Sequence, residues 1–428
     1  MKIKRRQFLK TSVLAASPLM LPGRMLHADA PSHQITAGFI GMGGQGTGRN
    51  LKGFFALKNV RVVAVCDCHL GRARKAKKMV DKKYQNKDCA VYQDFREVIA
   101  RDDIDVVVIS TPDQWHVPMS VMAMQAGKDV FCEKPSLTIV EGRQLVEAAE
   151  ASDRVFQWGI EDRTLTKYHL LAGWARSGLI GKVEKVTCTL PYQEPFKREE
   201  PVAVPDELDW NLWLGPAPLV DYTPSALDMF HWRLNSDYGG GMLSDWGTHL
   251  CDTAQVGLGE DAAGPVEAWG TCRELDPSAY NSDTPVDFKL TLKYASGAEL
   301  HVADNSTYKE LLLEFEGTDG WVRCKGWNGK LEASDPSILQ TRTFGPDANY
   351  WELPQVEHAD FIDAVVNRRK PAYHPEAGHR LCTALHLGHL ALREGRKIGW
   401  DPHSERFTTE PEANEASILY QRTPRNWA

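Results

Sequence analysis

Two kinds of apolar pattern divide the chain into two parts. In the first part the apolar runs are short, rich in β-branched residues and uninterrupted by polar positions. These runs are Ile35–Ile40, Val60–Val65, Val106–Ile109 and Val130–Cys132. Such runs are typical of strands buried on both faces of a parallel sheet. Segments with helical spacing, such as Pro118 to Ala126, lie between them. The pattern predicts a doubly wound α/β domain at residues 31–155.

The pattern changes after Val155, where Phe156–Gly159 is a short strand that opens the second part. Beyond Pro265, apolar and polar positions alternate with a period of two, which is typical of strands with one buried face. The predicted strands are Glu267–Cys272, Val286–Tyr294, Ala298–Asn305, Leu311–Gly317 and Trp321–Lys325. We therefore expect a second α/β domain, residues 156–402, with a large, mostly antiparallel, open-faced sheet. A second subunit is a plausible cover for that face, so we expect a homo-oligomer, either a dimer or a tetramer. Residues 403–428 read as a polar tail.

The first 30 residues have the layout of a twin-arginine export signal. Arg5 and Arg6 precede a short apolar segment, and Ala28-Asp29-Ala30 offers a cleavage site. The alternative is a basic, frayed terminus. Because the twin-arginine route exports folded proteins, the signal predicts a periplasmic location after folding in the cytoplasm. The nine cysteines are scattered and include no CxxC pair, so we interpret them as core thiols and expect no metal site.

Length and charge exclude some classes of protein. A chain of 428 residues predicts two or three domains, and the formal net charge of −7 argues against a nucleic-acid partner. No apolar run is long enough to span a bilayer.

A glycine-rich turn follows the first predicted strand. Gly41, Gly43 and Gly46 occupy the three glycine positions of G-x-G-x-x-G, which lets a pyrophosphate approach the backbone and the N-terminus of the next helix. Asp67 ends the second strand roughly 20 residues further on, where a carboxylate can bind the adenosine ribose hydroxyls. A carboxylate there repels a 2′-phosphate, so NAD is favoured over NADP, although Arg72 and Arg74 could soften that preference.

Polar residues also follow two later strands of the first part. Thr111 and Pro112 end one strand, and Glu133-Lys134-Pro135 ends the next. In open parallel sheets ligands bind beyond these carboxyl ends. The alternative for the tripeptide is a strand end with two solvated charges.

A second dense segment, Tyr238 to His249, leads from a glycine turn into a predicted helix. Asp245 and His249 are four residues apart and face one side of a helix, and Asp252 could orient the histidine ring. A metal site using Asp245, His249 and His231 ranks low, because no recognised ligand spacing is completed.

With these residues together, the sequence resembles the glucose–fructose oxidoreductase/inositol dehydrogenase family, called Gfo/Idh/MocA. The resemblance rests on four motifs: Gly41-x-Gly43-x-x-Gly46 with Asp67, Thr111-Pro112-Asp113-x-Trp115-His116, Glu133-Lys134-Pro135, and Gly239-Gly240-Gly241-x-Leu243-x-Asp245-x-Gly247-x-His249. The export signal and the Trp213-Leu214-Gly215-Pro216 loop look like an exported bacterial branch.

The resemblance implies a Rossmann NAD-binding domain and an α/β domain that mediates oligomerisation. It further implies that Lys134 hydrogen-bonds the reacting oxygen, that His249 is the general acid/base, and that Asp245 holds the substrate beside it. Residues implied at the nicotinamide side are Thr111, Pro112, His116 and Glu133. Arg163 falls where family members often have an arginine in the site.

Three functions remain open. The first is an NAD(P)-dependent oxidoreductase acting on a CH–OH group of a sugar, polyol or sugar derivative, with tightly bound cofactor because free NAD should be scarce outside the cytoplasm. The second is a glycosidase that uses transient oxidation and elimination, similar to glycoside hydrolase family 109, whose members typically carry valine where this chain has Lys134. The third is a non-catalytic sugar-binding relic. Trp115, Trp213 and Trp232 could stack on a sugar ring or pack in the core and the 195–224 loop.

Overall fold

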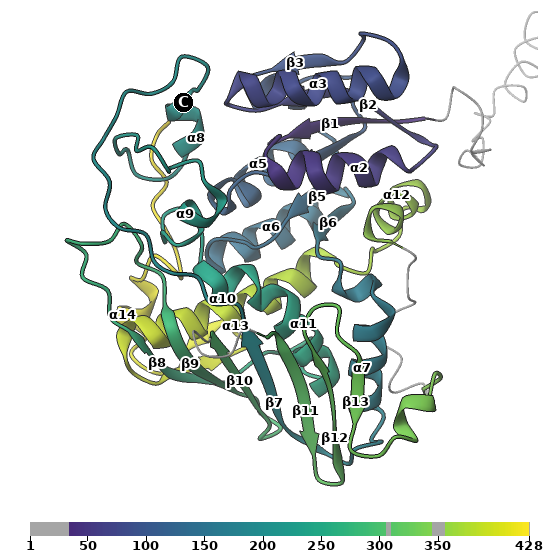
Figure 1. The fold of residues 1–428 in the computed structure, drawn as a ribbon, viewed down its shortest axis with the longest axis vertical. Coiled ribbons are helices and arrows are strands. Elements are labelled where there is room, and N and C mark those ends of the chain that lie inside the picture. The colour runs from purple at the N-terminus through teal and green to yellow at the C-terminus, as the bar shows by residue number, and fades with distance from the viewer. Residues whose placement is uncertain (1–33, 305–309, 345–355, 428) are drawn as a thin grey trace, which may run out of the picture. The chain divides into compact units, whose positions relative to one another are not determined.

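The computed structural model of the protein describes residues 34–304, 310–344 and 356–427. The predicted export signal lies outside these ranges and stays a prediction. Figure 1 shows two sheets, one made by the early part of the chain and one by the later part.

The first sheet has six parallel strands in the order β3-β2-β1-β4-β5-β6. The strands are β1 (Ile35–Ile40), β2 (Val60–Cys66), β3 (Ala90–Tyr92), β4 (Val106–Ile109), β5 (Asp129–Glu133) and β6 (Phe156–Gly159). All four residues of β4 are buried because helices cover both faces of the sheet, as its apolar run predicted. The strand order reverses between β1 and β4, which is where ligands bind in doubly wound sheets. The predicted doubly wound domain is confirmed.

The helices of this domain follow its strands. They are α2 (Leu51–Phe55), α3 (Leu70–Tyr84), α4 (Phe95–Ile99), α5 (His116–Gln125) and α6 (Ile139–Ser152), with a π turn η2 (Gly46–Asn50) and a 3-10 turn η3 (Asp113–Trp115). One expectation was wrong. Phe156–Gly159, which we placed in the second part, pairs with β5 as the sixth strand of the first sheet. A run of four residues does not reveal which sheet it joins, because partner choice depends on the rest of the fold.

The second sheet has nine strands in the order β13-β12-β11-β7-β10-β9-β8-β14-β15. They are β7 (Val183–Leu190), β8 (Glu267–Arg273), β9 (Val286–Lys293), β10 (Glu299–Asp304), β11 (Leu312–Gly317), β12 (Gly320–Lys325), β13 (Leu331–Ala333), β14 (Ile398–Asp401) and β15 (Arg406–Phe407). The β7–β10 pair is parallel and the other pairs are antiparallel. The mostly antiparallel sheet is therefore confirmed.

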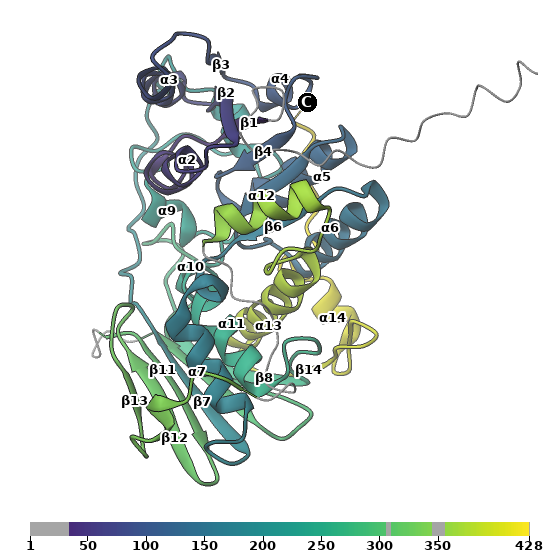
Figure 2. The ribbon, with the colours of Figure 1, turned by 90° about the vertical axis from the view of Figure 1, so that its right-hand side faces the viewer.

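Helices cover one face of the second sheet (Figure 2). They are α7 (Thr166–Arg176), α11 (Gly247–Leu258) and α13 (Pro375–Glu394). The opposite face carries polar side chains that pair across strands, such as Lys185 with Glu316 and Arg323 with Glu314. The remaining short helices are α8 (Trp210–Leu214), α9 (Met229–Arg233), α10 (Gly241–Asp245), α14 (Pro411–Glu415) and the 3-10 turns η4 (Asp162–Thr164) and η5 (Ile338–Gln340).

One late helix completes the first domain. Helix α12 (Glu357–Asn367) packs against α2 and β6, about 200 residues after that domain's last strand. The Phe361 ring lies edge-on to Phe54 and Phe131, with ring centroids 6.2 and 5.7 Å apart. His358 stacks on Phe131 and its Nε2 lies 3.1 Å from Oδ1 of Asn50. Phe54 and Phe131 of the first domain are thus covered by residues that lie late in the chain.

Candidate active site

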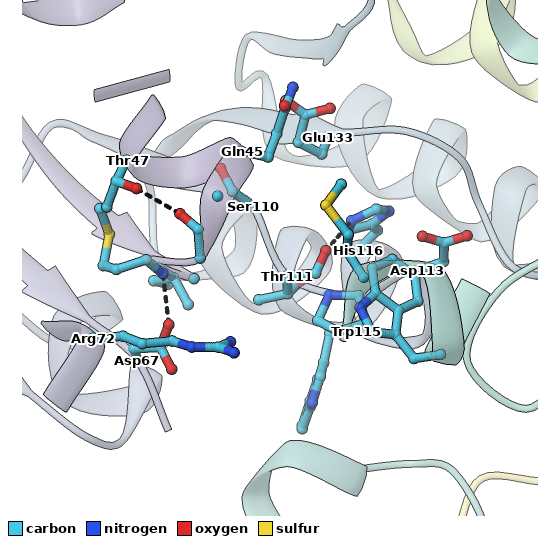
Figure 3. A pocket seen from close by; sticks show the side chains of 18 of the residues that line it. Gln45, Thr47, Asp67, Arg72, Ser110, Thr111, Asp113, Trp115, His116 and Glu133 are labelled. Atoms are coloured by element: carbon cyan, nitrogen blue, oxygen red, sulfur yellow. Dashed lines mark hydrogen bonds between the residues drawn. The ribbon is translucent and has the colours of Figure 1, made fainter. Parts of the chain in front are cut away.

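A cavity of about 860 Å³ opens at the carboxyl ends of the strands of the first sheet. Its walls come from both domains, because the turns after β1, β4 and β5 face segments of the second domain such as α9 and α10. Figure 3 shows side chains of these turns converging on one space. Ligand pockets typically measure about 300–1,000 Å³, so this cavity is large enough for an extended ligand.

The glycine turn is shaped to receive a phosphate. Gly41 has φ +86°, and a Cβ there would lie 2.5 Å from the carbonyl oxygen of Ser110. A Cβ on Gly46 would collide with the carbonyl oxygen of Gly41. By contrast, a Cβ on Gly43 would meet only Nη1 of Arg72, at 3.9 Å. The first and third glycines are therefore required by the protein itself, whereas the space above Gly43 is left for a ligand, as a pyrophosphate requires.

Asp67 lies at the next strand end. Its carboxylate accepts hydrogen bonds from the backbone N–H groups of Met42 and His69, at 2.7 and 2.9 Å. Burial raises the pKa of this carboxyl, while the two N–H groups and Arg72 oppose the shift. Each carboxylate oxygen keeps acceptor capacity for a ribose hydroxyl. Arg72 also lines the cavity beside Asp67 (Figure 3), whereas Arg74 is paired with Glu207.

The residues implied at the nicotinamide side line the same cavity, but two are held by the protein. The His116 ring lies between the carbonyl oxygens of Thr111 and Pro135, 2.9 and 2.8 Å from its nitrogens. Burial lowers the pKa of His116 to about 4, while the two carbonyl oxygens act in the opposite direction. The ring lies between the turns that follow β4 and β5. Glu133 accepts hydrogen bonds from Gln45 at 2.8 Å and Asn50 at 2.9 Å. Its carboxylate thereby ties β5 to the helix that follows the glycine turn.

Lys134 is not a solvated strand-end charge. Its Nζ donates to Oδ1 and to the carbonyl oxygen of Asp245, at 2.7 and 2.6 Å, and its side chain is 7% exposed. Nε of Arg233 lies 3.2 Å from the same Oδ1. Although burial alone would raise the pKa of Asp245, Arg233 and Lys134 hold it well below its usual range. The first domain thus contributes a buried ammonium group to a carboxylate of the second domain.

His249 lines the cavity close to this pair, at the start of α11. Nδ1 of its ring lies 2.7 Å from Oδ2 of Asp162. Burial lowers the pKa of His249 to about 4, and Lys134 acts in the same direction. The ring is therefore neutral near pH 7 and able to accept a proton. The structure brings together Lys134, Asp245 and His249, which the sequence had placed in separate motifs.

Two expectations about neighbouring residues were wrong. Asp252 does not orient His249, because both its oxygens accept from Arg163, at 3.0 and 2.7 Å. Arg163 consequently does not line the cavity; it is 6% exposed and stacks over Tyr373. The η4 turn directs Arg163 toward α11 and away from the cavity. The low-ranked metal set also fails, because His231 packs on Phe196 and is not in the cavity wall.

The tryptophans divide into two groups. Trp115 and Trp213 touch the cavity but are 2% and 5% exposed, and the Trp115 Nε1 donates to the carbonyl oxygens of Leu212 and Trp213. They therefore pack the loop against the first domain. Trp232 lines the cavity, with the Arg233 guanidinium 4.5 Å from its ring centre. Trp327, which the sequence analysis missed, reaches the cavity from the β12–β13 turn and lies 5.3 Å from the His249 ring.

The segment 205–214, here called the strap, joins the second domain to the adenosine end of the cavity. The carbonyl oxygen of Glu207 accepts from the N–H of Leu70, and Asp209 N–H donates to the carbonyl oxygen of Cys68, both at 2.9 Å. The Arg72 side chain reaches the carbonyl oxygen of Leu227, which lies just before α9. Both segments add residues to the cavity wall, so they cover the region beside Asp67.

The end of the chain braces the strap (Figure 1). Arg425 donates to Oδ1 of Asn211 in α8 at 2.7 Å. The Trp427 ring lies edge-on to Trp115, with ring centroids 4.7 Å apart. The last described residues of the chain therefore contact a wall of the cavity.

Comparison with known protein families accounts for this arrangement. The model of the NAD-binding Rossmann fold of the Gfo/Idh/MocA oxidoreductase family matches residues 35–160, and that of the family's C-terminal alpha/beta domain matches residues 171–428. The chain belongs to the Gfo/Idh/MocA family. It is therefore an enzyme of an oxidoreductase family, and the glycine turn and Asp67 fit NAD as its cofactor.

Similar proteins differ in their named activities. Glycosyl hydrolase family 109 protein 1 of Shewanella sp. (strain ANA-3) is 34% identical over 176 residues, covering 36% of this chain and 38% of the relative. The match thus spans less than half of that relative. The WlbA dehydrogenase of Chromobacterium violaceum, solved with NADH and UDP-GlcNAcA, has a TM-score of 0.65 at 18% identity, covering 88% of this chain and 99% of that one.

A third similar protein is the aldose-aldose oxidoreductase of Caulobacter crescentus, solved with glycerol. Its TM-score is 0.61 at 18% identity, covering 86% of this chain and 99% of that one. At such identities the two solved structures establish a shared fold. Within the described residues, no helix is both long and apolar enough to cross a membrane.

Proposed function

We propose that this Gfo/Idh/MocA protein is an NAD-dependent oxidoreductase that acts on a CH–OH group of a sugar, polyol or sugar derivative. The observation that carries the proposal is the meeting of Lys134, Asp245 and His249 at one end of a cavity whose other end has the glycine turn and Asp67. A cation and a neutral imidazole at the end of a dinucleotide site suit removal of a hydroxyl proton together with a hydride.

The chain's own groups each have a defined task. Lys134 donates a hydrogen bond to the reacting oxygen and stabilises the negative charge that develops there. His249 takes the hydroxyl proton on the ring nitrogen that faces away from Asp162. NAD, when bound, accepts the hydride. Asp245 holds the Lys134 side chain in place through two contacts, at 2.7 and 2.6 Å.

Aromatic side chains support a carbohydrate substrate. Trp327 and Trp246 lie beside His249 and line the cavity, and Trp232 lines it from α9. Apolar ring faces suit the C–H faces of a sugar, while the polar groups between them bind its hydroxyls. The Arg49, Lys134 and Arg233 cations are each paired with a carboxylate, which favours an uncharged sugar over a strongly charged one.

The strap supports a tightly held cofactor. The backbone contacts of Glu207 with Leu70 and of Asp209 with Cys68 hold the strap beside the adenosine end of the cavity. A retained cofactor is reduced and reoxidised within one catalytic cycle, which suits an exported protein. We accordingly propose a periplasmic location, reached through the predicted signal, and a homo-oligomer formed through the open face of the second sheet.

A second candidate is a glycosidase that oxidises a ring hydroxyl, eliminates the aglycone, adds water and reduces the ring again. It is favoured by the relative named glycosyl hydrolase family 109 protein 1, whose match covers part of each chain. The same Lys134, His249 and retained cofactor would serve its redox steps. A non-catalytic sugar-binding relic is not proposed, because the chain belongs to an enzyme family and Lys134 is paired with Asp245.

One experiment separates the candidates. The mature protein is purified after export, denatured, and its released nucleotide is measured per chain. Near-equimolar NAD supports a closed redox cycle, and the protein is then incubated without added cofactor with sugar pairs and with aryl glycosides. Exchange between sugars supports the oxidoreductase, whereas aryl alcohol release supports the glycosidase. An empty protein that reduces added NAD in the presence of sugars would refute the closed cycle, and one that does neither would refute both enzymes.

A further inference from the structure

His249 is held on one side by a buried carboxylate that its own sequence motif does not contain. Asp162 belongs to η4, directly after β6, and its side chain is 0% exposed. Its Oδ2 lies 2.7 Å from Nδ1 of His249. Among the residues that the structure describes, Nε2 of this ring has no hydrogen-bond partner, and the ring lines the cavity. The ring therefore presents Nδ1 to Asp162 and leaves Nε2 for a substrate.

A second buried pair fixes this geometry. Arg163, the next residue of η4, binds both oxygens of Asp252, which lies one turn after His249 on α11. The hydroxyl of Tyr373 donates to the same carboxylate at 3.1 Å. Two consecutive residues of η4 are thus bound to two residues of α11. The buried Arg163–Asp252 pair thus holds the backbone of η4 against α11, beside the contact of Asp162 with His249.

We propose that Asp162 is a positioning residue that fixes the tautomer of His249 and shares the proton that this ring takes from the substrate. The proposal rests on the proposed function, in which Nε2 is the base. When Nδ1–H donates to the Asp162 carboxylate, the lone pair is on Nε2, as a base requires. As the substrate O–H bond breaks, an N–H bond forms at Nε2. The C–H electron pair leaves as hydride to the nicotinamide.

The charges around the pair make this sharing favourable. Burial raises the pKa of the Asp162 carboxyl well above its ordinary value, and repulsion by Asp252 adds to this, whereas burial lowers the pKa of His249 to about 4. Each group alone resists ionisation, so a hydrogen bond between them lowers the cost of forming the imidazolium. The other charged groups that face the pair are Lys134 and Glu133 at the end of β5, Glu161 in the turn after β6, Asp245 in α10 and Arg49 in η2.

A divalent cation is the competing occupant of this position. Glu161, Asp162 and His249 each offer a ligand atom within 4.8 Å of the others. However, Nη1 of Arg49 already lies 3.1 Å from Glu161, and Lys134 acts on Asp162 as a second cation. These two positive charges satisfy the carboxylates and repel a metal ion. The Nδ1–Asp162 hydrogen bond is therefore the arrangement that the surrounding charges favour.

The test reads the ring directly by nitrogen NMR of the purified full-length protein labelled in histidine. His249 is assigned by its loss in His249→Gln. In the wild type we expect the neutral ring to carry its proton on Nδ1. In Asp162→Asn we expect the proton to move from Nδ1 to Nε2, because the carboxyl group that accepts from Nδ1–H is replaced by an amide that can donate to Nδ1. Asp261→Asn, which removes a carboxylate paired with Arg176, should leave the His249 signals unchanged.

Turnover gives the second readout. We expect Asp162→Asn to lower kcat by a factor of about 10²–10⁴ with a smaller change in KM. The variant loses the His249 tautomer that catalysis requires but keeps the groups that bind the substrate. Asp162→Glu keeps the charge and should retain the wild-type tautomer. A wild-type ring protonated on Nε2, an unchanged tautomer in Asp162→Asn, or a divalent metal retained after incubation with Mn²⁺ and gel filtration would each overturn the proposal.

The two proposals fail in different ways. The wild-type tautomer is read without Asp162→Asn, so a folding defect in that variant cannot hide the result. If the tautomer of His249 changes in Asp162→Asn while the wild type turns over no sugar or glycoside, the positioning role of Asp162 is upheld and the proposed function is refuted. If turnover is normal but the tautomer of His249 is the same in the wild type and in Asp162→Asn, the positioning role of Asp162 is refuted and the proposed function stands.

Discussion

Replacing Lys134 by methionine removes the cation of the site while keeping an unbranched side chain of similar length. The ammonium group is 2.7 Å from Asp245, and the side chain is 7% exposed. Loss of a donor that stabilises a developing oxyanion costs a factor of about 10²–10³ in kcat. We expect Lys134→Met to lose at least this much, because the missing group carries a full charge. KM should change less, since the interaction is strongest as negative charge develops.

The effect on stability should be smaller than for most buried ion pairs. Removing one partner of such a pair typically costs about 3–5 kcal/mol. In this protein Nε of Arg233 stays 3.2 Å from the same oxygen of Asp245, so the carboxylate keeps a cationic partner. The loss in the free energy of unfolding should therefore stay at or below the lower end of that range. The pKa of His249 should rise, because Lys134 is one of the groups that lower it.

The assay follows reduction of the bound nucleotide after mixing with the sugar that reacts fastest in a screen. Lys128→Met is the matched control. Lys128 is also buried, but its ammonium donates to the carbonyl oxygens of Arg101 and Ile104, away from the cavity. We expect this control to lose stability and keep turnover per folded chain. Rates of Lys134→Met within threefold of the wild type, with the nucleotide still bound, would refute the role of Lys134.

Four further predictions concern the cofactor site, the tail, the core and acid stability. Gly43→Val should weaken NAD binding and leave the melting temperature of the nucleotide-free protein unchanged. Gly41→Ala should lower that temperature, because Gly41 has φ +86° and a Cβ there would collide with the carbonyl oxygen of Ser110. Thermal melts with and without NAD compare the two variants. Trp427→Ala, which removes the ring against Trp115, should speed release of bound NAD, as followed by nucleotide fluorescence during dialysis; an unchanged rate would exclude the brace. Arg163→Met leaves Asp252 buried without its bidentate partner and should lower the free energy of unfolding by about 3–5 kcal/mol in urea titrations, and a loss below 1 kcal/mol would contradict the pairing. Burial lowers the pKa of His386 to about 4 and of His389 to about 3, so below pH 6.5 the unfolded chain binds more protons than the folded one. The free energy of unfolding should therefore be highest above that pH and fall as the pH drops toward 4. In His389→Leu the free energy of unfolding should depend less steeply on pH.

The first sheet could be predicted because its signal is local. A strand buried on both faces must be apolar at every position, and Val106–Ile109 has that pattern without help from distant residues. The same holds for the glycine turn, where φ and the close approach to Ser110 restrict the residue type. Lys134 and Asp245 could be named because each belongs to a short motif that can be recognised within its own stretch of sequence. Their contact at 2.7 Å required the fold.

The remaining features depend on contacts between distant segments. Asp162 and His249 are 87 residues apart, and a three-residue turn such as η4 has no periodicity that would reveal its direction. Asp252 had the right spacing to orient His249, but burial of Arg163 nearby gave it a stronger partner. Trp327 is a single aromatic residue in a hairpin turn, where sequence gives no reason to expect a cavity wall. Which residues pair in a crowded core is therefore harder to predict from sequence than which segments form helices or strands.

The return of α12 to the first sheet restricts how this enzyme can be recombined with its relatives. A fragment ending after β6 would contain every motif for the dinucleotide, yet it would expose Phe54 and Phe131, which Phe361 covers in the full chain. Such a fragment should aggregate, because apolar rings buried in the parent would face water. A chimera that exchanges the cofactor-binding half must therefore transfer two separate stretches of the gene, residues 34–160 and 356–368. Single-crossover libraries between distant family members should be depleted of folded products for this reason.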